Sequence, residues 1–306
     1  MNILSLFVLI PLLMLGALWA ARSLNQVRGV MVVGSTILLA LSVYLTIDYL
    51  ALRQAGATAE MLYTASTVWY APLNICYSVG VDGISVAMLL LSSIIVFTGT
   101  FASWQLKPMT KEYFLWFTLL SAGVYGFFIS TDLFTMFMFY EVALIPMYLL
   151  IGVWGSGQKE YAAMKLTLML MGGSAFLLIG ILGIFYGAGG DTMNILEIAQ
   201  RHIPTEMQRL FFPLIFLGFG VLGALFPFHT WSPDGHASAP TAVSMLHAGV
   251  LMKLGGYGCF RISIFLLPEA ANELAWVFII LTGISVVYGA FSACVQTDLK
   301  YINAYS

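Results

Sequence analysis

The chain has 306 residues, of which 60% are hydrophobic and only 8% are charged. A soluble domain carries about 25% charged residues, so a water-soluble surface cannot be built from this composition. The formal net charge of −2 gives no indication of a nucleic-acid partner or a polybasic lipid anchor. The three cysteines, Cys76, Cys259 and Cys294, are scattered and predict neither a zinc site nor a disulfide framework.

The apolar residues fall into runs long enough to cross a bilayer, whose hydrocarbon core requires about 20 residues per helix. The sequence predicts nine such spans, at residues 2–20, 29–51, 84–105, 113–130, 133–154, 163–187, 210–230, 240–266 and 274–296. No Lys or Arg precedes the first span, so we expect a retained membrane helix rather than a cleaved signal peptide. The sequence therefore predicts an all-α polytopic membrane protein with a single transmembrane domain over residues 1–306.

The connections between the spans predict an orientation. The connections after the first, third and fifth spans contain Arg22, Arg28, Lys107, Lys111 and Lys159, and the opposite side contains Arg53, Arg201, Arg209 and Arg261. Because cytoplasmic loops are enriched in Lys and Arg, this slight bias predicts an N-terminus outside the cytoplasm. The long outer connections, 52–82 and 188–209, have room for short interfacial segments. From Asp298 the chain reads as a loop entering a tenth helix that stops at Ser306, which indicates a fragment.

Glu141 stands near the middle of the fifth span, where a charged side chain costs about 2.5–3.5 kcal/mol. Unlike Lys or Arg, it is too short to reach the interface. One interpretation is a structural carboxyl that is protonated or hydrogen-bonded in the bundle. The other is a proton-carrying carboxyl whose protonation switches when a nearby cation moves. Pro146 frees the Val142 carbonyl, and it either loosens the helix near the acid or is an ordinary membrane-helix proline.

The eighth span contains a second ionisable residue near its middle, Lys253. Glycines surround Lys253 and allow close helix approach, so we expect its face to pack inside the bundle. Lys253 is interpreted either as a proton relay or as a lysine that snorkels to the interface. His247 points about 120° away from Lys253, and it is either a proton shuttle or a packed hydrogen-bonding residue. Lys165, near the start of the sixth span, either belongs to the path or snorkels.

Pro227 predicts that the helix of the seventh span breaks near Gly223. In transporters, such breaks mark the ion path. His229, Asp234 and His236 follow the break with a spacing that suits a metal site. No second cluster accompanies them, so the stretch "WSPDGH" is predicted to be a wet loop at a channel mouth.

Charged residues near the predicted helix ends have structural interpretations. Asp82 and Asp132 directly precede apolar spans and are predicted helix N-caps. Arg261 lies near the end of the eighth span and is predicted to be interfacial.

Four stretches that occur in order carry a resemblance to a known family. They are "VGVDGISVAMLLLSS", "FYEVALIPMYLLIGVWG", "FPFHTWSPDGHASAPTAVSMLHAGVLMKLGGYGCFR" and "QTDLKYINAYS". Together they resemble the M-type antiporter-like chain of proton-pumping NADH:quinone oxidoreductase, respiratory complex I. The resemblance implies about fourteen helices built around two inverted five-helix repeats. It implies N-terminal helices over 1–106, a complete first repeat over 113–266 and the start of a second repeat over 274–306.

By this resemblance, Glu141 matches the family's helix-5 glutamate and Lys253 its helix-8 lysine. The family also has a helix-7 lysine that pairs with the glutamate, but that position is Leu222 here. We therefore hypothesise that Lys165 or Lys253 supplies the counter-charge. His247 resembles the helix-8 histidine of the related L chain, and it is expected to take over part of the relay.

The resemblance implies a proton-translocating subunit of a translocase in the inner (cytoplasmic) membrane, beside L-type and N-type chains. No Gly-rich nucleotide fingerprint follows a strand and no cysteine cluster occurs, so NADH, FMN, iron–sulfur clusters and quinone are expected in partner subunits. One alternative is a subunit of a multi-subunit cation/proton antiporter or of a membrane-bound hydrogenase. Another is a non-pumping scaffold. Electron donor, quinone type, the choice between H⁺ and Na⁺ and the proton exit stay open.

Overall fold

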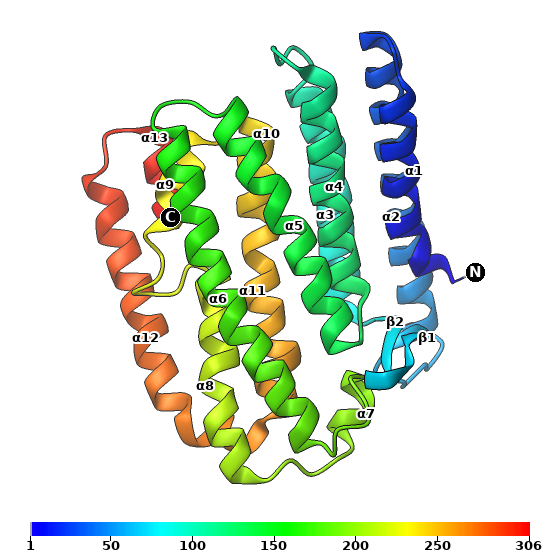
Figure 1. The fold of residues 1–306 in the computed structure, drawn as a ribbon, viewed down its shortest axis with the longest axis vertical. Coiled ribbons are helices and arrows are strands. Elements are labelled where there is room, and N and C mark those ends of the chain that lie inside the picture. Colours follow the sequence, from blue (N-terminus) through cyan, green and yellow to red (C-terminus); the bar gives the residue numbers. More distant parts are fainter. Residues whose placement is uncertain (1) are drawn as a thin grey trace.

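The computed structural model describes residues 2–306, and it is a bundle of long helices (Figure 1). Among these residues, eight helices are long and apolar enough to cross a bilayer. They are α1 (Leu6–Ala20), α2 (Leu24–Gln54), α3 (Gly83–Ala102), α4 (Thr110–Ile129), α5 (Leu133–Trp154), α6 (Lys159–Gly187), α8 (Thr205–Leu222) and α12 (Pro268–Val295). The predicted helical membrane fold is thus confirmed.

The eighth span, predicted at residues 240–266, is helical from residue 241 to residue 266 but is not a regular α-helix. It consists of α10 (Thr241–Leu246), the π-helical turn η3 (His247–Leu251), α11 (Met252–Gly258) and a second π-helical turn, η4 (Cys259–Ile264). π-Helical turns inside α-helices occur frequently at functional sites. Each turn here contains an ionisable residue, His247 in η3 and Arg261 in η4.

Short elements complete the chain. They are the 3-10 turns η1 (Ile3–Ser5) and η2 (Ala71–Leu73) and the helices α7 (Ile195–Ala199), α9 (Trp231–Ser238) and α13 (Leu299–Tyr305). In the bundle, α4 packs on α5, α5 on α6, and α6 on α8, while α1 and α2 lie against α4 and α3. α12 lies at the opposite side of the molecule from α1 (Figure 1).

An antiparallel β-hairpin fills the connection in which the sequence predicted only interfacial segments. It consists of β1 (Leu62–Tyr70) and β2 (Ile75–Val81). Asn74 adopts a left-handed conformation at the turn, and the hydroxyls of Ser66 and Ser78 hydrogen-bond across the strands at 2.6 Å. The strands are rich in aromatic and β-branched residues, which suits a pleated surface.

The predicted N-caps are confirmed. Asp82 accepts a hydrogen bond from the Ser85 amide at 2.8 Å, and Asp132 accepts one from the Thr135 amide at 2.9 Å. Arg261 lies near the end of the eighth span, and its interfacial position stays a prediction. Its side chain is only 9% exposed, and Asp82 and Glu60 provide carboxylates beside the guanidinium.

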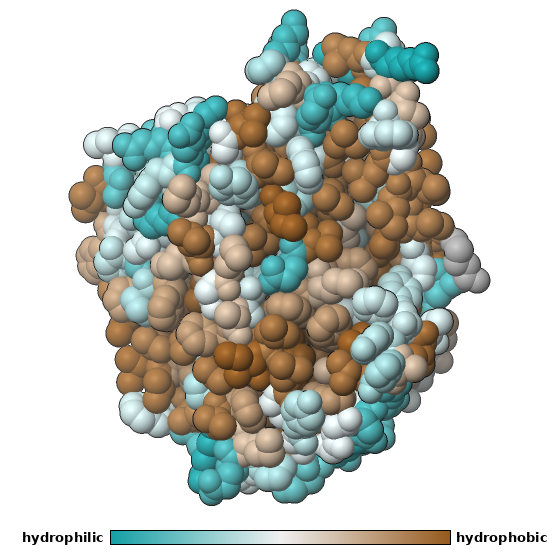
Figure 2. All heavy atoms as spheres, in the orientation of Figure 1, coloured by the Kyte–Doolittle hydropathy of each residue, from teal (hydrophilic) through white to brown (hydrophobic). Residues whose placement is uncertain are grey.

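On the face drawn in Figure 2, hydrophilic residues gather toward the two ends of the bundle and mostly apolar surface lies between them. We call the end at which α1 stops the basic end, and it carries seven Lys or Arg and four Asp or Glu. The opposite end, the acidic end, carries four Lys or Arg and nine Asp or Glu. The basic end has Arg22, Arg28, Lys107, Lys111, Lys159, Lys165, Lys300, Glu112, Glu160, Asp234 and Asp298. The acidic end has Arg53, Arg201, Arg209, Arg261, Asp48, Glu60, Asp82, Asp132, Asp191, Glu197, Glu206, Glu269 and Glu273. Of the Lys, Arg, Asp and Glu within residues 2–306, only Glu141 and Lys253 lie between the two ends.

Candidate functional site

The predicted helix break beside Pro227 is present. α8 stops at Leu222, Gly223 caps it, and the chain turns before α9 begins at Trp231. The Leu225 amide donates to the Gly220 carbonyl at 2.7 Å, and the Phe226 amide donates to the Ser285 hydroxyl of α12 at 2.7 Å. Irregular backbone at membrane depth is stable only where such groups are satisfied inside the protein.

The prediction of a wet loop at "WSPDGH" is wrong, because this stretch forms the helix α9 and is largely buried. Trp231 is fully buried, and its indole donates to the Val221 carbonyl at 3.1 Å. α9 packs against α6 and α13, which removes its side chains from solvent. The break therefore inserts a polar helix into the bundle.

Two histidines stack inside this region. The rings of His236 on α9 and His247 on η3 have centroids 4.2 Å apart and planes inclined by 22°. The Trp231 ring also stacks on His247, with centroids 5.3 Å apart. His247 is fully buried, and neither of its ring nitrogens has a hydrogen-bond partner within residues 2–306. His236 lies 3.1 Å from the Ser244 hydroxyl.

His236 is a candidate that the sequence analysis missed. Its loop assignment placed it in solvent, although it is 5% exposed. The sequence feature that could have predicted its position is Pro240, which stands between the end of α9 and the start of α10. That turn brings His236 and His247 together across 11 positions of sequence.

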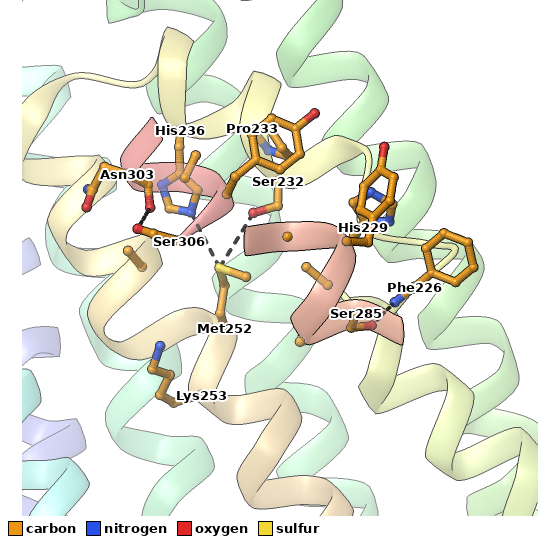
Figure 3. A pocket seen from close by; sticks show the side chains of 17 residues that line it. Phe226, His229, Ser232, Pro233, His236, Met252, Lys253, Ser285, Asn303 and Ser306 are labelled. Atoms are coloured by element: carbon orange, nitrogen blue, oxygen red, sulfur yellow. Dashed lines mark hydrogen bonds between the residues drawn. The ribbon is translucent and has the colours of Figure 1, made fainter. Parts of the chain in front are cut away.

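A cavity of about 270 Å³ lies beside the histidine pair (Figure 3). Lys253 borders it on one side and His229 on the other, with Met252 between them. The Met252 thioether lies 3.4 Å from His236 Nε2 and 3.7 Å from the Ser232 hydroxyl. The cavity thus places imidazole, hydroxyl and ammonium groups around one space.

Lys253 itself is exposed, contrary to the expectation that its face packs inside the bundle. The neighbouring glycines lie on different faces. Gly255 packs closely against the backbone of Phe219 and Gly223 of α8, whereas Gly256 faces open space. The predicted close helix approach is therefore real, but it occurs on the face that does not carry the lysine.

Glu141 lies on α5 and is half-buried. Its Oε1 is inaccessible to solvent and has no hydrogen-bond partner in the described part of the chain. Across residues 2–306, no Lys or Arg forms a salt bridge with it. Leu222, at the position of the family's helix-7 lysine, is fully buried.

Lys165 contacts a different acid from the one hypothesised. Its ammonium lies 2.6 Å from the Asp234 carboxylate of α9. The Tyr301 hydroxyl of α13 donates to the other oxygen of Asp234 at 3.2 Å. Lys300 donates to the carbonyls of Ala237 and Ala239, at 3.1 and 3.2 Å. The geometry therefore joins Lys165 to α9 and α13, and not to Glu141.

No group of three or more His, Cys, Asp or Glu within residues 2–306 is arranged to hold a metal ion. The metal interpretation of His229, Asp234 and His236 thus has no support in the geometry. Asp234 instead pairs with Lys165, and His236 stacks on His247. The site is a set of proton donors and acceptors along a broken helix.

Comparison with known proteins shows which family the chain resembles. A family model described as "NADH:quinone oxidoreductase/Mrp antiporter, TM" matches residues 130–306. An NAD(P)H-quinone oxidoreductase chain 4 of Picosynechococcus sp. is 40% identical over 248 residues, covering 81% of this chain and 45% of that protein. Another, of Thermosynechococcus vestitus, is 38% identical over 256 residues, covering 83% of this chain and 48% of that protein.

Solved structures share the fold. A chain of respiratory complex I from Thermus thermophilus aligns with a TM-score of 0.87 at 24% identity, covering 99% of this chain and 61% of that chain. A chain of the Mrp complex from Dietzia sp. aligns with a TM-score of 0.80 at 22% identity, covering 99% of this chain and 56% of that chain.

The chain spans about half the length of the curated relatives that it matches. The family model nevertheless covers more than half of this chain, including the broken helix, the histidine pair, Glu141 and Lys253. The chain therefore belongs to the NADH:quinone oxidoreductase/Mrp antiporter transmembrane family.

Proposed function

We propose that the chain is a proton-translocating membrane subunit of an NAD(P)H:quinone oxidoreductase. The supporting observation is the set of ionisable side chains inside the predicted spans, Glu141, His247 and Lys253, together with a broken helix that borders a partly polar cavity. A charge in a membrane span is costly, so such residues mark ion pathways by default. The similarity to oxidoreductase chain 4 proteins favours this complex.

Protons would enter from the basic end through the Lys165–Asp234 pair. A second cavity, of about 340 Å³, borders Asp234, Lys300 and Tyr301 there. Asp234 is an acceptor that Lys165 holds in place, and α9 connects it to His236 two residues further on. This arrangement gives the proton a polar approach to the histidine pair.

The histidine pair would perform the relay that the family assigns to the helix-7 lysine. Two imidazolium charges 4.2 Å apart in a poorly solvated site would repel strongly, so the pair holds at most one excess proton. It would then pass that proton through the cavity to Lys253. Because Lys165 pairs with Asp234, we assign the counter-charge of Glu141 to Lys253, with the histidine pair transmitting the effect.

We further propose that the basic end faces the cytoplasm, since cytoplasmic ends of membrane proteins are enriched in Lys and Arg. The membrane would be the inner (cytoplasmic) membrane, and L-type and N-type chains would be neighbours. NADH, FMN, iron–sulfur clusters and quinone would belong to partner subunits. Their redox chemistry would supply the energy for proton movement.

A second candidate is a subunit of a cation/proton antiporter. The fold likeness to the Mrp complex supports it. Purification of the assembled complex separates the two, because an oxidoreductase contains flavin and iron–sulfur subunits and an antiporter lacks them.

The proposed function is tested by Glu141→Gln in the assembled complex, reconstituted into liposomes. Removing a proton-carrying carboxyl should lower proton pumping by about 10²-fold or more, the size typical of a lost acid–base group. Glu112→Gln, at an exposed carboxyl of the basic end, is the matched control and should pump normally. Full pumping by an assembled Glu141→Gln complex would instead favour the non-pumping scaffold.

A further inference from the structure

His236 has a different partner at each of its two ring nitrogens. Nδ1 lies 3.1 Å from the Ser244 hydroxyl of α10. Nε2 lies 3.4 Å from the Met252 sulfur of α11 (Figure 3). Because His236 is only 5% exposed, these two side chains, and not bulk water, determine which nitrogen carries the proton of the neutral ring. Neither Ser244 nor Met252 has a role in the relay proposed above.

The two partners differ in what they can do in a hydrogen bond. A thioether sulfur has lone pairs but no hydrogen, so Met252 can only accept. A hydroxyl can donate or accept, so Ser244 suits either state of Nδ1. In a neutral imidazole one nitrogen is a donor and the other is an acceptor. Both contacts of neutral His236 are therefore satisfied only when Nε2 carries the proton and Ser244 donates to Nδ1.

The sulfur is held in place from the same helix that carries the ring. Ser232 stands four residues before His236 on α9, and its hydroxyl donates to the Met252 sulfur at 3.7 Å. Residues with this spacing share one helix face. His247 stacks on the face of the His236 ring, so it does not compete for either nitrogen. The opposite tautomer would direct the Nε2 lone pair at the sulfur, and an unmatched buried polar group is unfavourable.

We propose that Met252 and Ser244 are positioning residues that keep neutral His236 as the Nε2–H tautomer, so that an excess proton binds at Nδ1 beside Ser244. The use of this proton in the relay rests on the proposed function. On uptake, Nδ1 gains one N–H bond, and the Ser244 hydroxyl turns from donor to acceptor without losing its own proton. The protonated ring carries one proton on each nitrogen, and it becomes neutral again when one of them leaves.

This arrangement gives proton uptake a side. Met252 and Lys253 line the cavity beside the histidine pair, and Nε2 faces Met252 with its proton already in place. The Lys253 ammonium therefore finds no free lone pair at Nε2 of neutral His236. Return of a proton from Lys253 to Nε2 is opposed, while Nδ1 stays open to a donor beside Ser244.

The tautomer is read by solid-state ¹⁵N NMR of the full chain in lipid nanodiscs with labelled histidine. The chain has four histidines, and His236→Gln identifies the signals of His236 by their loss. With the ring neutral, wild type should show a protonated Nε2 and an unprotonated Nδ1. Met252→Leu keeps a similar volume but removes the acceptor, so the Nδ1–H form should rise by about tenfold relative to the Nε2–H form, as expected for one lost hydrogen bond. Met245→Leu, on the same span, is the matched control and should keep the wild-type ratio. A wild-type His236 protonated at Nδ1, or a wild-type ratio in Met252→Leu, would overturn the inference.

The role of Ser244 in proton transfer is tested in the assembled complex in liposomes. Ser244→Ala should slow pumping by about tenfold, which corresponds to about 1.4 kcal/mol in the barrier. Ser244→Thr keeps the hydroxyl and should restore pumping. A purely structural Ser244 predicts instead a lower thermal midpoint in the alanine variant with normal pumping, and this result would remove its role.

Glu141→Gln separates this inference from the proposed function. If Glu141→Gln stops pumping while Ser244→Ala pumps normally, Ser244 is not a positioning residue and the proposed function stands. If Glu141→Gln pumps normally, the proposed function is wrong, and the NMR ratio in Met252→Leu still decides whether the tautomer assignment is right.

Discussion

The His236–His247 stack shows how single residues build the site. The contacts of each ring are specific: Trp231 and His236 both stack on the His247 ring, and the Ser244 hydroxyl lies within hydrogen-bonding distance of His236. Burying a histidine without hydrogen-bond partners for its ring nitrogens costs free energy, because buried polar groups are normally satisfied. Such a residue therefore calls for an explanation. The proton transfer proposed for the pair would account for this cost.

His247→Leu should therefore keep the fold and lose the relay. Leucine fills a similar volume, so the free energy of unfolding should change by less than about 1.5 kcal/mol. Proton pumping by the assembled complex should fall by about 10²-fold, since an acid–base group is lost. His202→Leu, at an exposed histidine, is the control for replacing an imidazole. Unchanged pumping in His247→Leu would exclude the pair from the path.

Sequence identified the mid-span residues because an ionisable group in an apolar run stands out. Glu141, Lys253 and His247 were found in this way. The partners of Arg261 and Lys165 were not, since ion pairs with Asp82 and Asp234 join segments that are 179 and 69 positions apart in the chain. Charge type is visible in a sequence, but tertiary neighbours are not.

At the scale of elements, the eighth span approaches the backbone at the end of α8 most closely at Gly255. A Cβ at Gly255 would lie 2.5 Å from the Phe219 carbonyl oxygen and 2.6 Å from the Gly223 nitrogen. These are backbone atoms at the end of α8, so they cannot turn away as a side chain can. The same contact fixes Gly223, where the broken helix begins.

Gly255→Ala should push the eighth span away from α8. Overpacking of this kind costs about 1–3 kcal/mol, which should appear as a lower thermal midpoint of the purified complex and reduced assembly. Gly256→Ala is a matched control on the adjacent residue, because a Cβ there meets nothing within 4 Å. It should leave the midpoint close to wild type. Equal midpoints for the two variants would contradict the proposed role of this contact.

Hydropathy predicted most ends of the membrane helices to within about five residues, because a bilayer demands long apolar segments. The exceptions are the end of α8, at Leu222 instead of residue 230, and the start of α12, at Pro268 instead of residue 274. It did not predict the β-hairpin, whose first strand is mostly exposed and so lacks an alternating buried face. It also did not predict η3 and η4, since a π-helical turn has no distinct hydropathy. The predicted break at Pro227 is present because proline removes a helical hydrogen bond locally, whatever its tertiary neighbours are.

For the whole molecule, the unequal charge of the two ends predicts the orientation of the chain in the membrane. The basic end has an excess of Lys and Arg, and the acidic end has nine acids against four basic residues. This difference is larger than the loop count in the sequence suggested, because the structure also places Lys165 and Lys300 at the basic end. The arrangement fits the proposed entry of protons at the basic end.

Single cysteines at the two ends should react with a membrane-impermeant maleimide from opposite sides. In a Cys294→Ser background, Thr58→Cys lies in an exposed connection at the acidic end and should be labelled in intact cells. Gln158→Cys lies in an exposed connection at the basic end and should be labelled only after the membrane is opened. The background without either added cysteine reports labelling of the remaining cysteines. Labelling of Gln158→Cys in intact cells, with Thr58→Cys protected, would invert the topology and reverse the direction of the proposed proton route.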